Sequence, residues 1–145
     1  MTDTAFTQNR IQAAGIGRYI AAGLLAGTAA FILNNIIYLI MTAIGGFSWD
    51  FLTAASIVLA SLLPNLLAAL AFFGLSRFTG RARLLLTVGV IVFVLVSVLP
   101  HLGIGPPPSP ALETLPDGFD LVTIPLHIVF GLTAILIIPW WVERN

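Results

Sequence analysis

The chain has 145 residues, of which 59% are hydrophobic and only 8% are charged, and its formal net charge is zero. Because a soluble domain usually carries about 25% charged residues, this composition argues against a water-soluble protein and predicts that lipid surrounds most of the chain. Six basic residues without a basic face argue against nucleic-acid binding, and the lack of cysteine excludes disulfides and thiolate chemistry.

Four hydrophobic segments follow one another along the chain. Their lengths match helices that cross a bilayer, and we expect transmembrane helices over residues 19–44, 51–76, 84–100 and 123–142. The apolar run after residue 18 is longer than the ~7–15 residues of a signal-peptide core, so we expect that helix to be retained. The remaining segments are the N-terminal segment 1–18, the outer turn 45–50, the inner turn 77–83, the outer Pro-rich acidic loop 101–122 and the tail 143–145.

The basic residues predict how these helices are threaded. All of them lie in segments 1–18, 77–83 and 143–145, whereas the other two connections contain acidic residues and no Lys or Arg. Basic residues of short loops stay on the cytoplasmic side, and short connections make consecutive helices antiparallel neighbours. We therefore predict an all-α membrane protein with four transmembrane helices in an antiparallel bundle and both termini in the cytoplasm.

Small residues predict where the helices pack closely. Gly23 and Gly27 form a GxxxG pattern on the first helix, and Ser56 and Ala60 begin a stripe of small residues on the second. Lipid is as apolar as the helices, so association depends on close approach and polar contacts. We expect these four residues to serve helix packing, either within the chain or, as the alternative, in a dimer.

Four polar residues in the hydrophobic segments are the candidate ligand-binding residues: Asn34, Asn65, His101 and His127. At ~1.5 Å per residue, Asn34 and His127 both lie about 24 Å above the inner charges, with His101 just above them and Asn65 about one turn below. A polar cluster in the outer half of the bundle is therefore expected if the helices pack together.

His127 permits several interpretations. Burial and the positive end of a helix both disfavour an imidazolium, so we expect a neutral ring that forms an interhelical hydrogen bond, contacts a ligand such as haem or a chlorin, or transfers a proton. For His101 we expect a solvated interfacial residue. Two histidines are too few for a closed zinc site, so no metal is predicted, and no cofactor is predicted apart from the haem or chlorin alternative at His127.

Prolines and aromatic residues add local expectations. Pro64 is expected to kink the second helix and to free the carbonyl of the residue four positions earlier. Pro125 is expected in the first turn of the fourth helix, with Thr123 as the N-cap. Aromatic rings favour the membrane interface, which predicts interfacial positions for Tyr19, Trp49, Trp140 and Trp141.

The chain resembles a family of uncharacterised bacterial four-helix integral membrane proteins that is known only as a domain of unknown function. The resemblance rests on the inner turn 77–83, on the aliphatic helix that ends at Pro100, and on a fourth helix in which His127 is followed by aliphatic residues and by Pro139. It implies a multi-pass protein of the bacterial inner membrane without an assigned activity, and it adds no catalytic residue.

The sequence contains no hydrolase, metalloprotease or phosphate-loop motif, so we expect no enzyme. The leading expectation is a structural or accessory subunit of a larger membrane complex, with lipid and other membrane subunits, or a second copy of the chain, as partners. The alternative is a membrane protein that binds a pigment, haem or small molecule through His127. A small transporter or channel is a weaker alternative, because the hydrophobic segments contain no Asp, Glu, Lys or Arg.

Overall fold

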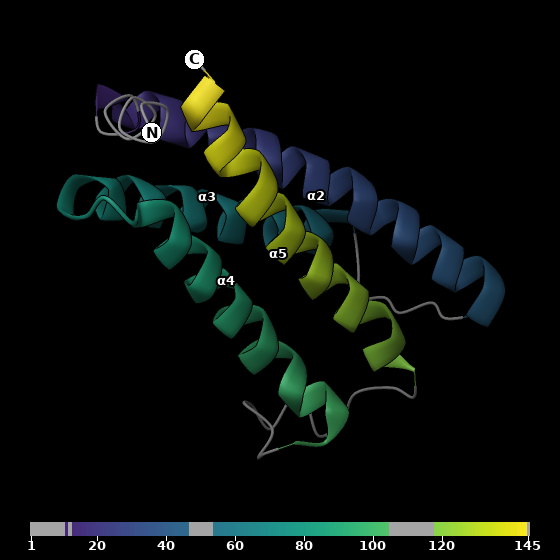
Figure 1. Cartoon of the computed structure of the whole chain (residues 1–145). Helices are drawn as coiled ribbons and strands as arrows, with labels where there is room; N and C mark the ends of the chain where they lie inside the picture. Colours follow the sequence, from purple (N-terminus) through teal and green to yellow (C-terminus); the bar gives the residue numbers. More distant parts are fainter. Residues whose placement is uncertain (1–10, 12, 47–53, 105–117, 145) are drawn as a thin grey trace.

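Four long helices make up most of the protein (Figure 1). The computed structural model describes residues 11, 13–46, 54–104 and 118–144. Within these residues there is no strand, and the elements are α2 (Ile16–Gly45), α3 (Ala54–Phe78), α4 (Ala82–Val98), the 3-10 turn η1 (Leu99–Leu102) and α5 (Phe119–Arg144). By length and composition, four helical segments are suited to crossing a membrane, which confirms the prediction of an all-helical protein with four such helices.

The start of α5 differs from its prediction. The helix begins at Phe119, after Gly118 with a left-handed φ of 82°, and Asp120 in its first turn suits the positive end of the helix. Pro125 consequently lies inside α5 and not in its first turn. Thr123 does not cap the helix either, because its hydroxyl donates to the Phe119 carbonyl oxygen at 3.0 Å.

Some sequence expectations lie outside the described residues. These are the interfacial position of Trp49, most of the outer turn, and the proline-rich part of the loop 101–122. At the described edge of the outer turn, α2 ends at Gly45, and Gly46 adopts a left-handed φ of 67° while its N–H donates to the Thr42 carbonyl. Glycine adopts this conformation at little cost, which explains the end of the helix at the Gly-Gly pair.

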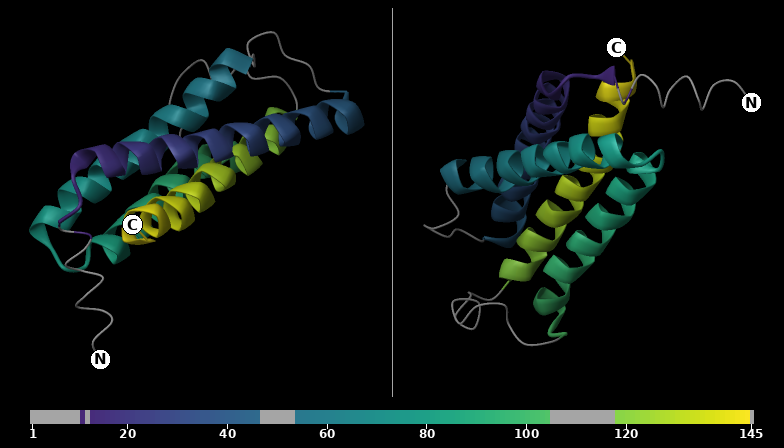
Figure 2. Two further views of the ribbon diagram at one scale, coloured as in Figure 1. Left: turned by 90° about the horizontal axis from the view of Figure 1, so that it is seen from above. Right: turned by 90° about the vertical axis from the view of Figure 1, so that its left-hand side faces the viewer.

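The helices form a bundle in which α2 and α4 lie on opposite sides. α2 packs along α3 and α5, and α4 packs against the same two helices. A short turn around residue 80 connects α3 to α4, and the two helices diverge from this turn (Figures 1 and 2). Side chains of α3 and α4, together with Phe130 of α5, line a groove in this region.

Two glycines allow α2 and α3 to approach each other closely. A Cβ atom on Gly23 would lie 2.9 Å from the Ala69 Cβ, and one on Gly27 would lie 2.9 Å from the Leu62 Cα. A larger side chain at either position would therefore push the backbones apart.

The Ser56 and Ala60 stripe is placed differently, since Ser56 is half-buried and Ala60 is exposed. Ser61 and Asn65 are the buried polar residues of α3 in this part of the bundle.

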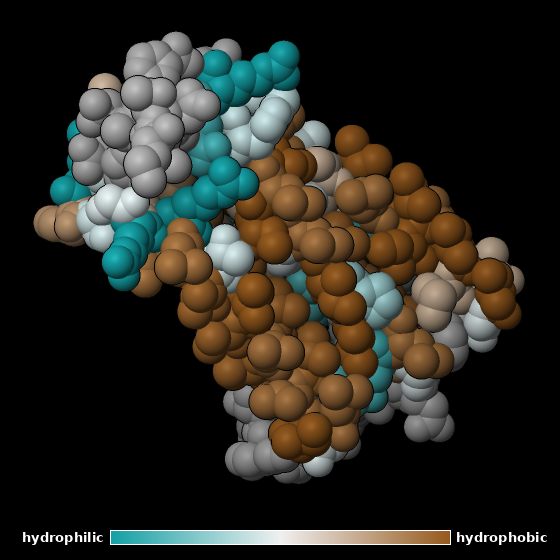
Figure 3. Space-filling model, viewed as in Figure 1, coloured by the Kyte–Doolittle hydropathy of each residue, from teal (hydrophilic) through white to brown (hydrophobic). Residues whose placement is uncertain are grey.

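One end of the bundle, called the basic end below, carries Arg18, Arg77, Arg81, Arg83 and Arg144. In Figure 3 the hydrophilic residues of the visible face gather mainly at one end, while hydrophobic residues cover most of the rest. Arg83 at the start of α4 forms an ion pair with Glu143 near the end of α5, with an N–O distance of 3.0 Å. Arg77 at the end of α3 donates to the Ala14 carbonyl oxygen at 2.9 Å.

Tyr19 is a buried residue of the basic end, so the prediction of an interfacial ring at this position is wrong. Its side chain is fully buried, and its hydroxyl lies 2.8 Å from the Ile11 carbonyl oxygen and 2.9 Å from the Ser76 hydroxyl. The ring packs edge-on against Phe72. α2 approaches α3 closely at Gly23, which is one helical turn after Tyr19. This approach holds the Tyr19 side chain against α3. Trp140, by contrast, is exposed, with the Arg144 guanidinium 5.0 Å from its ring centroid.

Candidate functional site

A network of buried polar side chains links α2, α3 and α5. The Asn34 Nδ2 donates to the Ser61 hydroxyl oxygen at 2.9 Å, and the Asn65 Nδ2 donates to the Ser61 carbonyl oxygen at 2.9 Å. The Thr133 hydroxyl on α5 lies 3.2 Å from the Asn65 Oδ1. All four side chains are buried. In an apolar surrounding such hydrogen bonds hold three helices in one register.

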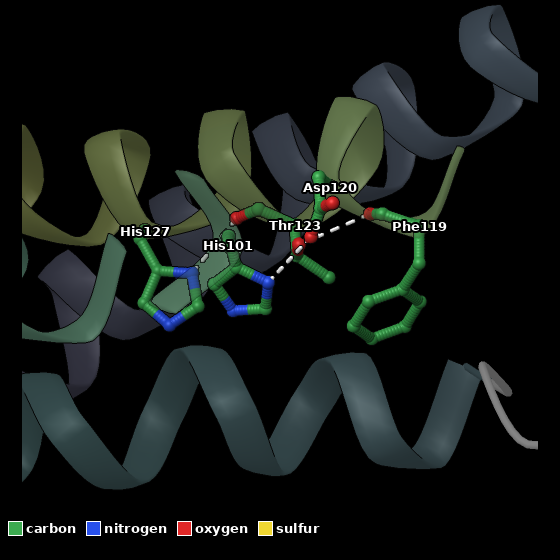
Figure 4. A network of polar contacts seen from close by, with 5 residues as sticks. All are labelled: His101, Phe119, Asp120, Thr123 and His127. Carbon is green, nitrogen blue, oxygen red and sulfur yellow. Dashed lines mark hydrogen bonds and ion pairs between the residues drawn. The ribbon is translucent and has the colours of Figure 1, made fainter. Parts of the chain in front are cut away.

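The two histidines form a second group, at the end of the bundle away from the basic end (Figure 4). Their ring centroids are 5.8 Å apart. The His101 Nδ1 lies 2.7 Å from the Asp120 Oδ1, and the His101 side chain is only 9% exposed. The expectation that His101 is solvated is therefore wrong, because the first turn of α5 brings a carboxylate to its ring and Phe119 lies beside it.

His127 has a defined tautomer in this arrangement. Its Nδ1 lies 2.8 Å from the Thr123 carbonyl oxygen of the preceding helical turn. A carbonyl oxygen only accepts hydrogen bonds, so Nδ1 carries the proton, and in a neutral ring Nε2 is left as an acceptor. Figure 4 shows the Nδ1 edge turned toward α5 and the other edge of the ring turned away from that helix.

A pocket of about 170 Å³ joins the two polar groups. Asn34 from α2, Pro64 from α3 and His127 from α5 all line it. We call it the polar pocket, and the described residues that line it are Asn34, Ala60, Pro64, Phe93, Leu126, His127 and Phe130. The pocket therefore collects residues from all four long helices.

Two further acceptors in the lining of the polar pocket lack the partners that a helix or an amide usually provides. The Asn34 Oδ1 is buried and has no hydrogen-bond partner among the described residues. The Ala60 carbonyl receives no helical hydrogen bond from residue 64, because proline has no N–H. Unpaired polar groups at membrane depth are costly unless they line a cavity that supplies a partner. The pocket lining thus contains residues from three helices, Asn34, Ala60 and His127, that each have an acceptor atom without its usual partner.

An apolar groove of about 360 Å³ adjoins the polar pocket. The two share Pro64, Phe93 and Phe130. Leu67 and Leu85, which also line the groove, are themselves exposed on the surface of α3 and α4, so the groove opens sideways between these diverging helices. Ligand sites usually combine an apolar lining of about 300–1,000 Å³ with a few polar groups, and the groove and the polar pocket together match this description.

The sequence predicted the region of this site but not its construction. Of the four candidate ligand-binding residues, Asn34 and His127 line the polar pocket, Asn65 belongs to the buried network, and His101 lies beside His127. Sequence reasoning missed Asp120 and Thr133, and it missed Phe93 and Phe130, whose rings lie edge to face with centroids 5.6 Å apart. Asp120 was detectable as an acidic residue close to the start of a helix, whereas the phenylalanines resemble any other apolar residue of a membrane helix.

Metal binding has no support at the site. The described residues contain no group of three or more His, Cys, Asp or Glu side chains that could hold a metal ion.

The chain matches no protein-family model, no curated protein and no solved structure. The resemblance to uncharacterised bacterial membrane proteins consequently stays a prediction.

Proposed function

We propose that this protein is a multi-pass membrane protein that binds a small amphipathic molecule from the lipid phase and catalyses no reaction. The observation that carries this proposal is the adjacency of two spaces that share Pro64, Phe93 and Phe130: an apolar groove lined by α3 and α4, and a polar pocket lined by Asn34 and His127. A molecule dissolved in the bilayer reaches such a groove sideways, with its apolar part along the helices and its polar part in the pocket.

The orientation that we propose places the basic end in the cytoplasm of a bacterial cell, with four helices that cross the inner membrane as an antiparallel bundle. The positive-inside tendency supports this orientation, because every Arg of the described residues lies at helix ends that meet there. The contacts of Arg77 with Ala14 and of Arg83 with Glu143 join those ends. The polar pocket then lies in the half of the membrane away from the cytoplasm.

Small-molecule binding agrees with the dimensions of the site better than haem or chlorin binding at His127 does. A macrocycle bound at His127 would lie in the polar pocket itself, whose volume of about 170 Å³ is below the ~300 Å³ of typical ligand sites, whereas an alkyl chain can extend from the pocket into the groove. Transport has less support, because the core on the basic-end side of Asn65 is filled by apolar side chains such as Ala26, Phe72 and Ile138. The accessory-subunit function stays a prediction, since an exposed apolar helix face suits lipid as well as another chain.

Native mass spectrometry of the protein extracted in mild detergent tests this function. Gly89 lines the groove, and a Cβ atom added there meets no atom within 4 Å, so Gly89→Leu fills the groove without a backbone clash. The matched control is Gly74→Leu, because Gly74 on α3 also has no atom within 4 Å of an added Cβ and does not line the groove. We expect a co-purified small molecule on the wild type and on Gly74→Leu, and its loss from Gly89→Leu. Equal retention by all three proteins, or no bound molecule on any of them, would contradict the proposal.

A further inference from the structure

The polar pocket also indicates which chemical class of molecule it binds. We infer that the bound molecule is a neutral lipid-phase molecule with a hydroxyl group, which donates its hydrogen bond to the acceptors formed by Asn34 and His127 while its apolar tail lies in the groove. This inference rests on the proposed function and adds the chemistry of the ligand to it.

Acceptors dominate the polar atoms of the pocket lining. The Asn34 Nδ2 donates one of its two hydrogens to Ser61, and the Asn34 Oδ1 is buried and has no hydrogen-bond partner among the described residues. The His127 Nδ1 is engaged with the Thr123 carbonyl, which leaves Nε2 as the acceptor. The carbonyl of Ala60 lacks its helical donor because of Pro64. A ligand that only accepts hydrogen bonds, such as an ester or an ether, would leave these three acceptors unpaired.

The ligand is also expected to be uncharged. Among the described residues, no Asp, Glu, Lys or Arg lines the polar pocket or the groove, so an ammonium group would find no counter-charge there and a phosphate group would find no basic partner. A charge without a partner is costly at this depth. A hydroxyl group satisfies an acceptor without bringing a charge, which makes it the group that the lining favours.

The polar end of the ligand decides selectivity. A molecule that moves from the bilayer into an apolar groove exchanges one apolar surrounding for another, and so its tail gains little. Hydrogen bonds between membrane helices contribute about 0.6–2 kcal/mol, which corresponds to a change in affinity of about three- to thirty-fold. A hydroxyl compound should therefore bind by about that factor more tightly than its methyl ether.

Photolabelling in phosphatidylcholine vesicles tests the inference. The probes are dodecanol and dodecyl methyl ether, each with a diazirine in the alkyl chain, and labelled peptides are quantified by mass spectrometry at increasing probe concentration. We expect both probes to label the groove on α3 and α4, with an apparent affinity about three- to thirty-fold higher for the alcohol. Asn34→Leu should remove this preference, and Asn35→Leu is the matched control, because the Asn35 side chain donates to the Phe31 carbonyl of its own helix and does not line the pocket.

The outcomes separate the inference from the proposed function. His127→Phe provides a second test if Asn34→Leu does not fold, and it should also abolish the preference for the alcohol. Equal labelling of the groove by the alcohol and the ether would overturn the hydroxyl inference and leave the binding function intact. If neither probe labels the groove more strongly than it labels the lipid-facing surface of α4, the hydroxyl inference and the proposed binding function are both overturned.

Discussion

Asn34 and His127 line one pocket although they come from the first and the last of the four long helices. The Asn34 Nδ2 donates a hydrogen bond to the Ser61 hydroxyl oxygen, and the His127 Nδ1 donates one to the Thr123 carbonyl oxygen. Each is left with an acceptor atom, the Asn34 Oδ1 and the His127 Nε2. Most polar groups in a membrane bundle serve the association of helices, and these two acceptors are not used for it.

The contact of α2 with α3 depends on the missing side chain of Gly27. In Gly27→Ala the new Cβ would meet the Leu62 Cα at 2.9 Å, and such overpacking usually costs about 1–3 kcal/mol. We expect the free energy of unfolding, measured by denaturant titration in mixed micelles, to fall by that amount. Gly74→Ala is the control, because an added Cβ meets no atom there and alanine favours a helix by up to about 1 kcal/mol. Equal stability of the two variants would disprove the close contact.

The Thr133 hydroxyl on α5 lies 3.2 Å from the Asn65 Oδ1 on α3, and it shares its one hydrogen between this oxygen and the carbonyl oxygens of Val129 and Phe130, each at 3.0 Å. Thr133→Val keeps the shape of the side chain and removes the hydroxyl, which leaves the Asn65 Oδ1 without this partner. We expect a loss of about 0.6–1.7 kcal/mol in the free energy of unfolding. Thr87→Val is a suitable control, since Thr87 is half-buried on α4 and takes no part in this network. A loss no larger than that of Thr87→Val would show that the hydrogen bond contributes nothing.

The ion pair of Arg83 with Glu143 should contribute little to stability. The Arg83 side chain is 59% exposed, and exposed pairs are typically worth less than about 1 kcal/mol. We expect Arg83→Glu to destabilise the protein slightly, by less at high salt because the charges are screened. The exchange Arg83→Glu with Glu143→Arg should restore the stability. A double variant less stable than Arg83→Glu would argue against a direct contact.

The proposed orientation can be tested by labelling single cysteines, because the chain contains none. Gly80→Cys lies in the turn at the basic end, and Leu102→Cys lies at the end of η1, where the side chain is exposed. In intact bacterial spheroplasts we expect a membrane-impermeant maleimide to modify the cysteine at 102 and to reach the one at 80 only after permeabilisation. The reverse pattern would place the basic end outside.

The hydropathy of the chain was sufficient to predict four helices, because each segment is apolar on every side and the connections are polar. The same uniformity explains what could not be predicted. A helix that is apolar all round does not reveal which side faces its neighbours, so the pattern of small residues on α3 did not distinguish the exposed Ala60 from the buried Ser61. The burial of Tyr19 depends on the approach of α2 to α3, which a pattern of interfacial aromatic residues cannot reveal.

The polar residues of the site were conspicuous because they interrupt hydrophobic segments, and counting from the charged ends was enough to place Asn34 and His127 at one level. The groove beside them follows from the divergence of α3 and α4, which is a property of the whole bundle. Neither Leu67 nor Gly89 differs in sequence context from other apolar residues, and so the space that they line needed the structure.

Nitrogen-15 NMR of the histidines tests the central claim most directly. The chain contains two histidines, and His101→Gln assigns their signals. For the wild type in lipid nanodiscs we predict that His127 carries its proton on Nδ1, and that added dodecanol shifts the His127 Nε2 resonance while dodecyl methyl ether does not. A His127 protonated on Nε2, or an Nε2 resonance that the alcohol leaves unchanged, would contradict the assignment of this atom as the acceptor in the polar pocket.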